Sequence, residues 1–390
     1  MPPDSHTEQQ AAQLEAFRPR WRGQPARLEV WYATFSDPTH NVGVWIHHEI
    51  VSPPRSKSSS WSKLRGWNTR TTSASDLRPA SGSGSKPESA HQQIQETGLA
   101  CGTAARPVPT SGGPDHSQDP GAVTKGWVAI FENDRPPILE RFGPAPVHLG
   151  MLNITAQSVP TPDGTSISSS SLAGTAGILT WDFEYQDVTK PLFTFPRWAW
   201  RSELLPAAQV VVSPAASFSG RLVTQDRTVH IDSACGSVAH IYGHGNAERW
   251  GWLHADLGGG DTIEVVSAVA RTPGLRAVGP LTLVQLRTAG ADWPRDPLIA
   301  APLFRSQLNL PTWKISGVTG TRRLRAEVTI PESTSITLGY TDPDGSSATC
   351  TNSELSDAEI ILERTVRGAW QVEKHWTLTG SAHAEIGRRP

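Results

Sequence analysis

The feature that most constrains this chain is the alternation of side chains over residues 249–257. With the period of two that a β-strand has, one face of this segment is polar and aromatic and the other is aliphatic. The first face carries Trp250, Trp252, His254 and Asp256, and the second carries Leu253, Ala255 and Leu257. Three glycines, 258–260, separate the segment from a second strand-like segment, 261–266. Because glycine permits the positive φ angles of tight turns, the pattern predicts a β-hairpin.

This hairpin is expected to bring a histidine and a carboxyl group together. If Leu257 pairs with Asp261, then Glu264 lies directly opposite His254, and cross-strand neighbours on one face are about 5 Å apart. Such a pair, beside two indole rings, can share a proton and carry out acid chemistry on an apolar substrate. The alternative is that both tryptophans are core residues and that His254 has a structural role.

Composition and charge narrow the class of protein. The 390 residues include 34 Gly, 32 Pro and 15 Trp but only 2 Met, which suits an all-β protein with many turns better than a helical bundle. The formal net charge of −2 does not favour a nucleic acid as partner. The three cysteines, Cys101, Cys235 and Cys350, have no spacing typical of disulfides or metal sites and fit a reducing cytoplasm.

The sequence gives no sign of export or membrane insertion. The N-terminus has no basic start followed by an apolar run, and no uninterrupted apolar stretch approaches about 20 residues. We therefore expect a cytoplasmic protein without a transmembrane segment.

A second candidate acid–base group lies in residues 42–51, which read as a strand that follows another at 27–35. Alternation places Trp45, His47 and Glu49 on the same side of this strand. His47 and Glu49 beside an indole ring again form a group that can exchange protons. The alternative is a solvated strand face.

Between residues 53 and 124 the composition changes to serine, glycine and proline with isolated charges. Because such a segment has too few apolar residues to bury, we predict a disordered low-complexity insertion, or sequence foreign to the fold. Strand-like sequence resumes at 126–131, which is expected to pair with 42–51.

Many further short strand-like segments follow, with turn residues between them and no long amphipathic helical pattern. Evenly spaced antiparallel strands predict an all-β sandwich or barrel.

Several tryptophan-containing segments together resemble the lipocalin-like superfamily that includes hydroxyneurosporene synthase (the carotenoid hydratase), tocopherol cyclase and the lipocalin-like Diels–Alderases. The resemblance implies two consecutive antiparallel β-barrel or β-sandwich domains, an apolar cavity at or between them, no organic cofactor, and chemistry on isoprenoid or polyketide hydrocarbons. The long insertion departs from the family pattern. The segments that carry the resemblance are residues 31–34, His47-His48-Glu49, Gly126-Trp127, Trp198-Ala199-Trp200, residues 245–252 with the glycine-rich hairpin, and the closing strand with Trp376.

On this basis we expect residues 1–25 to form an N-terminal tail with a short helix at 8–18. Residues 26–212 are expected to form a first lipocalin-like domain, interrupted by the insertion at 53–124, and residues 213–390 a second lipocalin-like barrel.

The resemblance also implies roles for individual side chains of the hairpin. Addition of water or a tethered hydroxyl to an alkene requires an acid that stays protonated in a dry pocket, and burial raises the pKa of a carboxyl group. Asp256 and Glu264 are the candidate acids, with His254 as hydrogen-bond partner or base. Trp250 and Trp252 are expected to stabilise a carbocation by cation–π attraction.

Other candidates are weaker. His240, Tyr242, His47 and Trp45 are expected to line the substrate pocket. The spacing His240-x3-His244 is that of a helical metal pair, but its strand context does not favour zinc, and we expect no metal. His383 and Glu385 are expected in a frayed polar tail rather than at a cavity mouth.

We therefore expect a cofactor-independent hydratase (a lyase) or cyclase (an isomerase) that acts on a hydrophobic isoprenoid or polyketide-derived alkene. The alternative is a non-catalytic binder or carrier of a hydrophobic small molecule.

Overall fold

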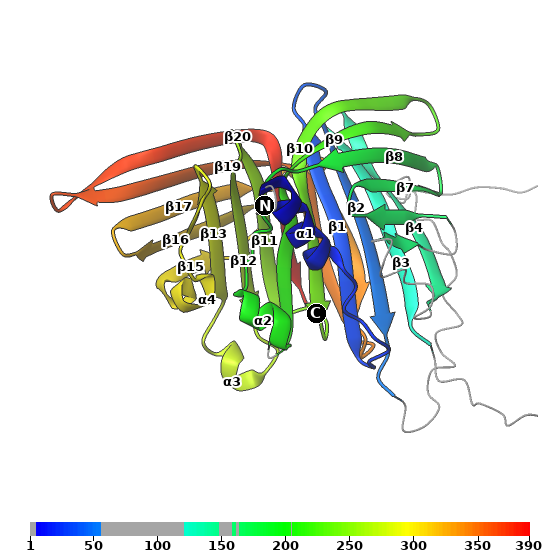
Figure 1. Ribbon diagram of the computed structural model, residues 1–390, viewed down its shortest axis with the longest axis horizontal. Coiled ribbons are helices and arrows are strands. Elements are labelled where there is room, and N and C mark those ends of the chain that lie inside the picture. The colour runs from blue at the N-terminus through cyan, green and yellow to red at the C-terminus, as the bar shows by residue number, and fades with distance from the viewer. Residues whose placement is uncertain (1–4, 56–120, 148–157, 161–163, 204) are drawn as a thin grey trace, which may run out of the picture. The chain divides into compact units, whose positions relative to one another are not determined.

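The computed structural model describes residues 5–55, 121–147, 158–160, 164–203 and 205–390. The expected insertion falls mostly outside these ranges, so disorder there remains a prediction. The described chain consists mainly of antiparallel strands in two sheets, which confirms the all-β class (Figure 1).

The first sheet has ten strands in the order β4-β3-β2-β1-β10-β9-β8-β7-β6-β5. Its strands are β1 (Arg27–Asp37), β2 (Val42–Ser52), β3 (Val123–Glu132), β4 (Arg135–Pro146), β5 (Ser158–Pro160), β6 (Ser166–Ser168), β7 (Ser171–Ala176), β8 (Leu179–Gln186), β9 (Ala207–Val223) and β10 (Thr228–Gly243).

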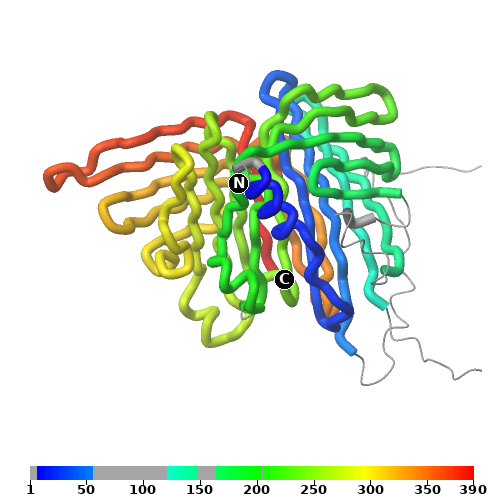
Figure 2. The backbone as a smooth tube through the Cα atoms, viewed as in Figure 1, coloured from blue at the N-terminus to red at the C-terminus, as the bar shows by residue number. Residues whose placement is uncertain are grey.

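The second sheet follows the order β14-β13-β12-β11-β20-β19-β17-β16-β15, and β18 pairs with β19 beside this path. Figure 2 shows β20, in red, returning along the sheet from the far end of its long hairpin with β19. The strands are β11 (Arg249–Gly258), β12 (Asp261–Val269), β13 (Leu281–Thr288), β14 (Ala291–Trp293), β15 (Phe304–Gln307), β16 (Thr312–Thr319), β17 (Arg322–Thr329), β18 (Ile336–Thr341), β19 (Ser347–Val366) and β20 (Ala369–Arg388).

Helices are short. They are α1 (Ser5–Phe17), α2 (Arg197–Ser202), α3 (Pro273–Arg276) and α4 (Pro297–Ala300), with 3-10 turns at Ala301–Leu303 and Glu332–Thr334. Within the described residues, none of these helices combines the length and apolarity needed to cross a bilayer.

The N-terminal segment is not a loose tail. Ala16 and Phe17 at the end of α1, and Trp21 just after it, are buried in the core of the first sheet. Burial of these apolar side chains fixes the segment against the sheet.

The two predicted strand pairings are present. β2 pairs with β3, with His47 opposite Trp127. β11 pairs with β12, with His254 opposite Glu264. The turn differs in one detail: Asp261 pairs with Gly258 instead of Leu257, because the register shifts after Asp256.

The expected boundary between residues 212 and 213 falls inside β9, which runs on to Val223 and pairs with β10. Pro214 lies where the β9–β10 register shifts, and such irregularities accommodate a proline that cannot donate a ladder hydrogen bond. The first sheet therefore extends to Gly243.

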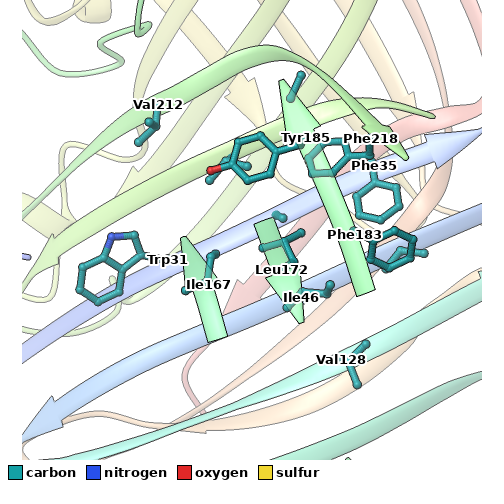
Figure 3. Packing of buried hydrophobic residues seen from close by; sticks show 14 of the residues in the cluster. Trp31, Phe35, Ile46, Val128, Ile167, Leu172, Phe183, Tyr185, Val212 and Phe218 are labelled. Carbon is teal, nitrogen blue, oxygen red and sulfur yellow. The ribbon is translucent and has the colours of Figure 1, made fainter. Parts of the chain in front are cut away.

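Each sheet buries one face in its own core, because side chains alternate along a strand. In the first sheet this core includes Trp31, Phe35, Phe183 and Phe218 (Figure 3). In the second sheet it includes Leu253, Val265, Trp313 and Ile360.

The other faces of the two sheets meet. Val30 and Tyr32 of β1 share a buried cluster with Trp252 of β11, and Trp45 and Trp127 share another with strands β18 and β19. Along each strand, the side chains that alternate with those of the core therefore point toward the other sheet and are buried between the two sheets.

The β2–β3 pairing predicts that the insertion can be excised. Val51 pairs with Val123, so the strand ends are adjacent and a short Gly-Ser linker can replace residues 56–120. We expect the variant to keep the near-ultraviolet circular dichroism spectrum. Closing a shorter connection costs less chain entropy, so the unfolding free energy in urea should rise by up to about 2 kcal/mol. Loss of cooperative unfolding would show that the sheet needs the excised residues.

Candidate active site between the sheets

A layer of polar and aromatic side chains lies between the two sheets. We call it the intersheet layer. Strands β1, β2 and β9 contribute to it from the first sheet, and β11, β12, β19 and β20 from the second. All its members are buried. They are Tyr32, His47, Gln209, Trp250, Trp252, His254, Glu264, Glu354, His383 and Glu385.

Glu264 holds the two sheets together through hydrogen bonds. Its Oε1 accepts from Nε1 of Trp252 and from Nε2 of Gln209, which is on β9 of the first sheet. Its Oε2 lies 3.0 Å from Nδ1 of His254. Three neighbours from both sheets thus fix both oxygens of one carboxyl group.

Burial raises the pKa of Glu264 above the ordinary value, against the hydrogen bonds from His254, Trp252 and Gln209, which lower it. The carboxyl group has no exposed surface, and removal from water disfavours its charged form. Glu264 therefore holds a proton more tightly than an exposed glutamate does.

A second histidine–glutamate pair lies beside the first. His383 is the cross-strand neighbour of His254, and its Nδ1 lies 2.8 Å from Oε1 of Glu354. Burial, with the nearby His254, keeps the pKa of His383 well below its ordinary value. Burial and the neighbouring Glu385 raise the pKa of Glu354 well above its ordinary value. Both members of this pair therefore favour the neutral form.

Three buried polar atoms in this part of the layer have no hydrogen-bond partner among the described residues: Nε2 of His254, Nε2 of His383 and Oη of Tyr32. The Trp252 indole contacts two of these residues, with ring centroids 4.3 Å from Tyr32 and 3.8 Å from His383, and His254 is the cross-strand neighbour of His383. Burial, with the nearby carboxyl groups, raises the pKa of Tyr32 well above its ordinary value, so the phenol remains a donor. Unpaired buried polar atoms are costly and rare, and a cluster of them marks a candidate site.

At the His47 end of the layer, the adjoining side chains are charged. Glu49 lies 3.0 Å from Nζ of Lys125 and 3.2 Å from Nε2 of His47. Burial alone would raise the pKa of Glu49, but the Lys125 ammonium and His47 lower it to about 2. The His47 ring stacks on Trp127 at 3.7 Å, with Trp45 edge-on. The predicted acid–base group is present, but its carboxylate is held as an ion.

Asp256 shares the face of His254 but lies at the end of the strand, where its Oδ1 accepts the backbone N–H of Gly258 at 2.7 Å. It is half-buried, and this hydrogen bond closes the hairpin turn. The structure does not bring Asp256 into contact with Glu264.

His240 and Tyr242 lie on the opposite face of the first sheet. His240 stacks on Trp31 and lies 2.8 Å from Oε1 of Glu29. Tyr242 belongs to the first-sheet core. Both were expected to line the substrate pocket, but this face of β10 points to α1 and away from the second sheet.

Sequence reasoning missed several members of the layer. His383 and Glu385 lie in β20 and are buried instead of frayed. Tyr32, Gln209 and Glu354 had no motif of their own, although the alternation of Tyr32 with core residues in β1 was a usable signal. No group of three or more His, Cys, Asp or Glu side chains within the described ranges has a metal-holding arrangement.

Comparison with known proteins places the chain in a family. The family described as tocopherol cyclase-like matches residues 162–388. The uncharacterized proteins Rv0493c and MT0513 of two Mycobacterium tuberculosis strains, H37Rv and CDC 1551, are each 39% identical over 376 residues, or 95% of this chain and 89% of theirs.

The solved structure of CghA shares the fold. CghA is 9% identical with a TM-score of 0.51, over 93% of this chain and 88% of CghA. Kievitone hydratase from Nectria haematococca is 11% identical with a TM-score of 0.45, over 96% of this chain and 91% of the hydratase. At 9% identity the likeness to CghA shows the fold alone. The family match spans more than half of the sequence, and the chain therefore belongs to the tocopherol cyclase-like family.

Proposed function

We propose that this protein is an enzyme, a hydratase or cyclase that acts on a hydrophobic isoprenoid or polyketide-derived alkene in the intersheet layer and needs no organic cofactor. The observation that carries the proposal is the buried His254–Glu264 pair, in which Nε2 of His254 has no hydrogen-bond partner among the described residues and Glu264 accepts a hydrogen bond from Trp252. Membership of the tocopherol cyclase-like family supports cyclisation or hydration as the reaction class.

The proton held by the pair can leave through Nε2 of His254. In the protonated pair, one proton is shared between Oε2 of Glu264 and Nδ1 of His254. A second hydrogen is bonded to Nε2 of His254. Transfer of the Nε2 hydrogen to an alkene carbon moves the shared proton fully to Nδ1 and leaves a Glu264 carboxylate. Trp252 already donates to this carboxyl group. The hydrogen bond that stabilises the carboxylate product is therefore in place before the transfer begins.

Aromatic rings surround the place where positive charge would develop. The Trp252 indole and the Tyr32 ring meet edge to face at 61°, and their π-faces attract a carbocation more strongly in a dry site than in water. For a substrate with a conjugated carbonyl group, the same Nε2–H and the Tyr32 hydroxyl can instead donate to the carbonyl oxygen and promote a pericyclic closure.

His383 is the candidate base. When its ring hydrogen is on Nδ1 and is donated to Oε1 of Glu354, the unpaired Nε2 of the neutral ring carries no hydrogen and can accept a proton from water in a hydration or from a substrate hydroxyl in a cyclisation. Glu354 fixes the ring through Nδ1, so the base is oriented by a third group, as in other acid–base sites. The side chains pack closely, and a substrate must separate them to enter.

Substitution of the acid pair should separate catalysis from binding. We expect His254→Gln and Glu264→Gln each to lower turnover of a productive polyene or prenylated quinol at least about 100-fold. Affinity, measured by tryptophan-fluorescence titration, should change little, because the proton acts in the transition state. Product analysis by mass spectrometry measures the turnover.

A matched control is the exposed His375–Glu359 pair, whose side chains are 3.0 Å apart on the β19–β20 hairpin. His375→Gln should leave turnover unchanged. Asp256→Asn tests the other candidate acid and should also leave most activity. Binding without conversion in the unmodified protein would favour a carrier, and loss of turnover only in Asp256→Asn would transfer the acid role to Asp256.

The second pair predicts a pH-dependent stability difference. Because the pKa of Glu354 is higher in the folded than in the unfolded chain, its contribution to stability is full below the unfolded value and is lost as pH rises through the folded value. Glu354→Gln cannot ionise, so its melting temperature relative to the unmodified protein should rise between pH 5 and pH 9. A difference that stays constant with pH would show that Glu354 is not protonated in the folded protein.

A further inference from the structure

A groove of about 300 Å³ lies on the outer side of the first sheet, between the segment after α1 and helix α2. Four arginines line it, with only one acidic residue and one indole ring. The lining residues that matter here are Glu15, Arg18, Arg20, Arg22, Trp200 and Arg201. Because the whole chain has a formal net charge of −2, this concentration of positive charge is local.

The buried His240–Glu29 pair fixes the segment that carries two of the arginines. Glu29 accepts the backbone N–H groups of Arg20 and Trp21 at 2.5 and 2.8 Å. His240 lies 2.7 Å from the backbone oxygen of Ala16 and 2.8 Å from Oε1 of Glu29. Both ring nitrogens of His240 are thus occupied in holding residues 16–21, the segment that carries Arg18 and Arg20. The pair has a positioning role here instead of the substrate-binding role expected from the sequence.

The arginines are held in different ways. Arg20 donates to the backbone oxygen of Trp200, and its guanidinium lies over that indole at 4.5 Å. Burial lowers the pKa of Arg20, so its charge is incompletely solvated. Arg22 donates to the backbone oxygens of Pro19 and Trp21.

Local carboxylates do not neutralise the groove. Arg201 pairs with Glu15 at 3.3 Å, and both side chains are exposed. Arg20 lies 3.5 Å from Glu203. Within the described part of the chain, neither Arg18 nor Arg22 has a carboxylate partner. At least two guanidinium groups thus face the groove without an anion.

We propose that this groove binds a phosphate group, carried by a small phosphorylated molecule or by a phospholipid headgroup. Guanidinium groups present paired N–H donors that match phosphate oxygens, and several of them around one small groove balance a doubly charged group. The groove lies on the face of the first sheet opposite the intersheet layer, so it is separate from the site for the hydrophobic substrate. It does not depend on the proposed reaction.

Calorimetric titration with inorganic pyrophosphate, and sedimentation with phosphatidylglycerol vesicles, test the proposal. We expect Arg18→Gln and Arg22→Gln each to weaken binding about tenfold. The side chain of Arg18 has no partner within the described residues, so its substitution should leave the melting temperature unchanged. Arg305→Gln is a matched control for Arg22, because Arg305 donates to the backbone oxygens of Pro302 and Phe304 in the same relative positions.

The outcomes are distinct. Pyrophosphate binding that depends on Arg18 and Arg22 but not on Arg305 supports a soluble phosphate ligand. Vesicle binding alone, with the same dependence, supports a phospholipid headgroup. No binding of either probe, or an equal loss in Arg305→Gln, overturns the proposal, because weak attraction to any exposed arginine would then explain the data.

Discussion

The hydrogen bonding of the Glu264 carboxyl group between two sheets is the interaction on which the rest of the site depends. Without partners, a fully buried carboxyl group would oppose the packing of β9 against β11 and β12. Gln209 from one sheet and Trp252 from the other supply these partners, so the contact that satisfies the acid also joins the sheets. The desolvation that raises the pKa of Glu264 follows from the same packing. The packing of the two sheets therefore accounts both for the position of Glu264 and for its raised pKa.

The sequence predicted the contacts between strands that follow one another along the chain. The His254–Glu264 pair followed from alternation and a glycine turn, and the β2–β3 pairing followed from composition on both sides of the insertion. Alternation places His240 and Tyr242 on one face of their strand. It did not show which face meets the second sheet, because both faces of β10 are buried and the covering element, α1, is far away in sequence. Glu354 and His383 were missed for a related reason: their pairing joins distant parts of a long hairpin.

Two buried histidine–glutamate pairs in this protein have the same composition but differ in their remaining hydrogen bonds. In the His240–Glu29 pair, both ring nitrogens of the histidine have partners within the protein, and the carboxylate also accepts two backbone N–H groups. In the His254–Glu264 pair, Nε2 of the histidine is left without a partner in the described chain. A saturated pair can only position its surroundings, whereas an unsaturated pair can exchange a proton with a bound molecule. The number of unmet hydrogen bonds thus distinguishes the two roles better than residue type does.

The two ends of the intersheet layer differ in charge. Near Glu49, the Lys125 ammonium provides a full positive charge and keeps the carboxylate ionised. Near Glu264 and Glu354, neutral or shared-proton partners take the place of a lysine, and burial raises both pKa values. A carbocation intermediate would be repelled by Lys125 and attracted by the indole and phenol rings around Trp252. A substrate is therefore expected to place its reacting carbon beside Trp252 and His254, and its inert hydrocarbon toward Trp45 and Trp127.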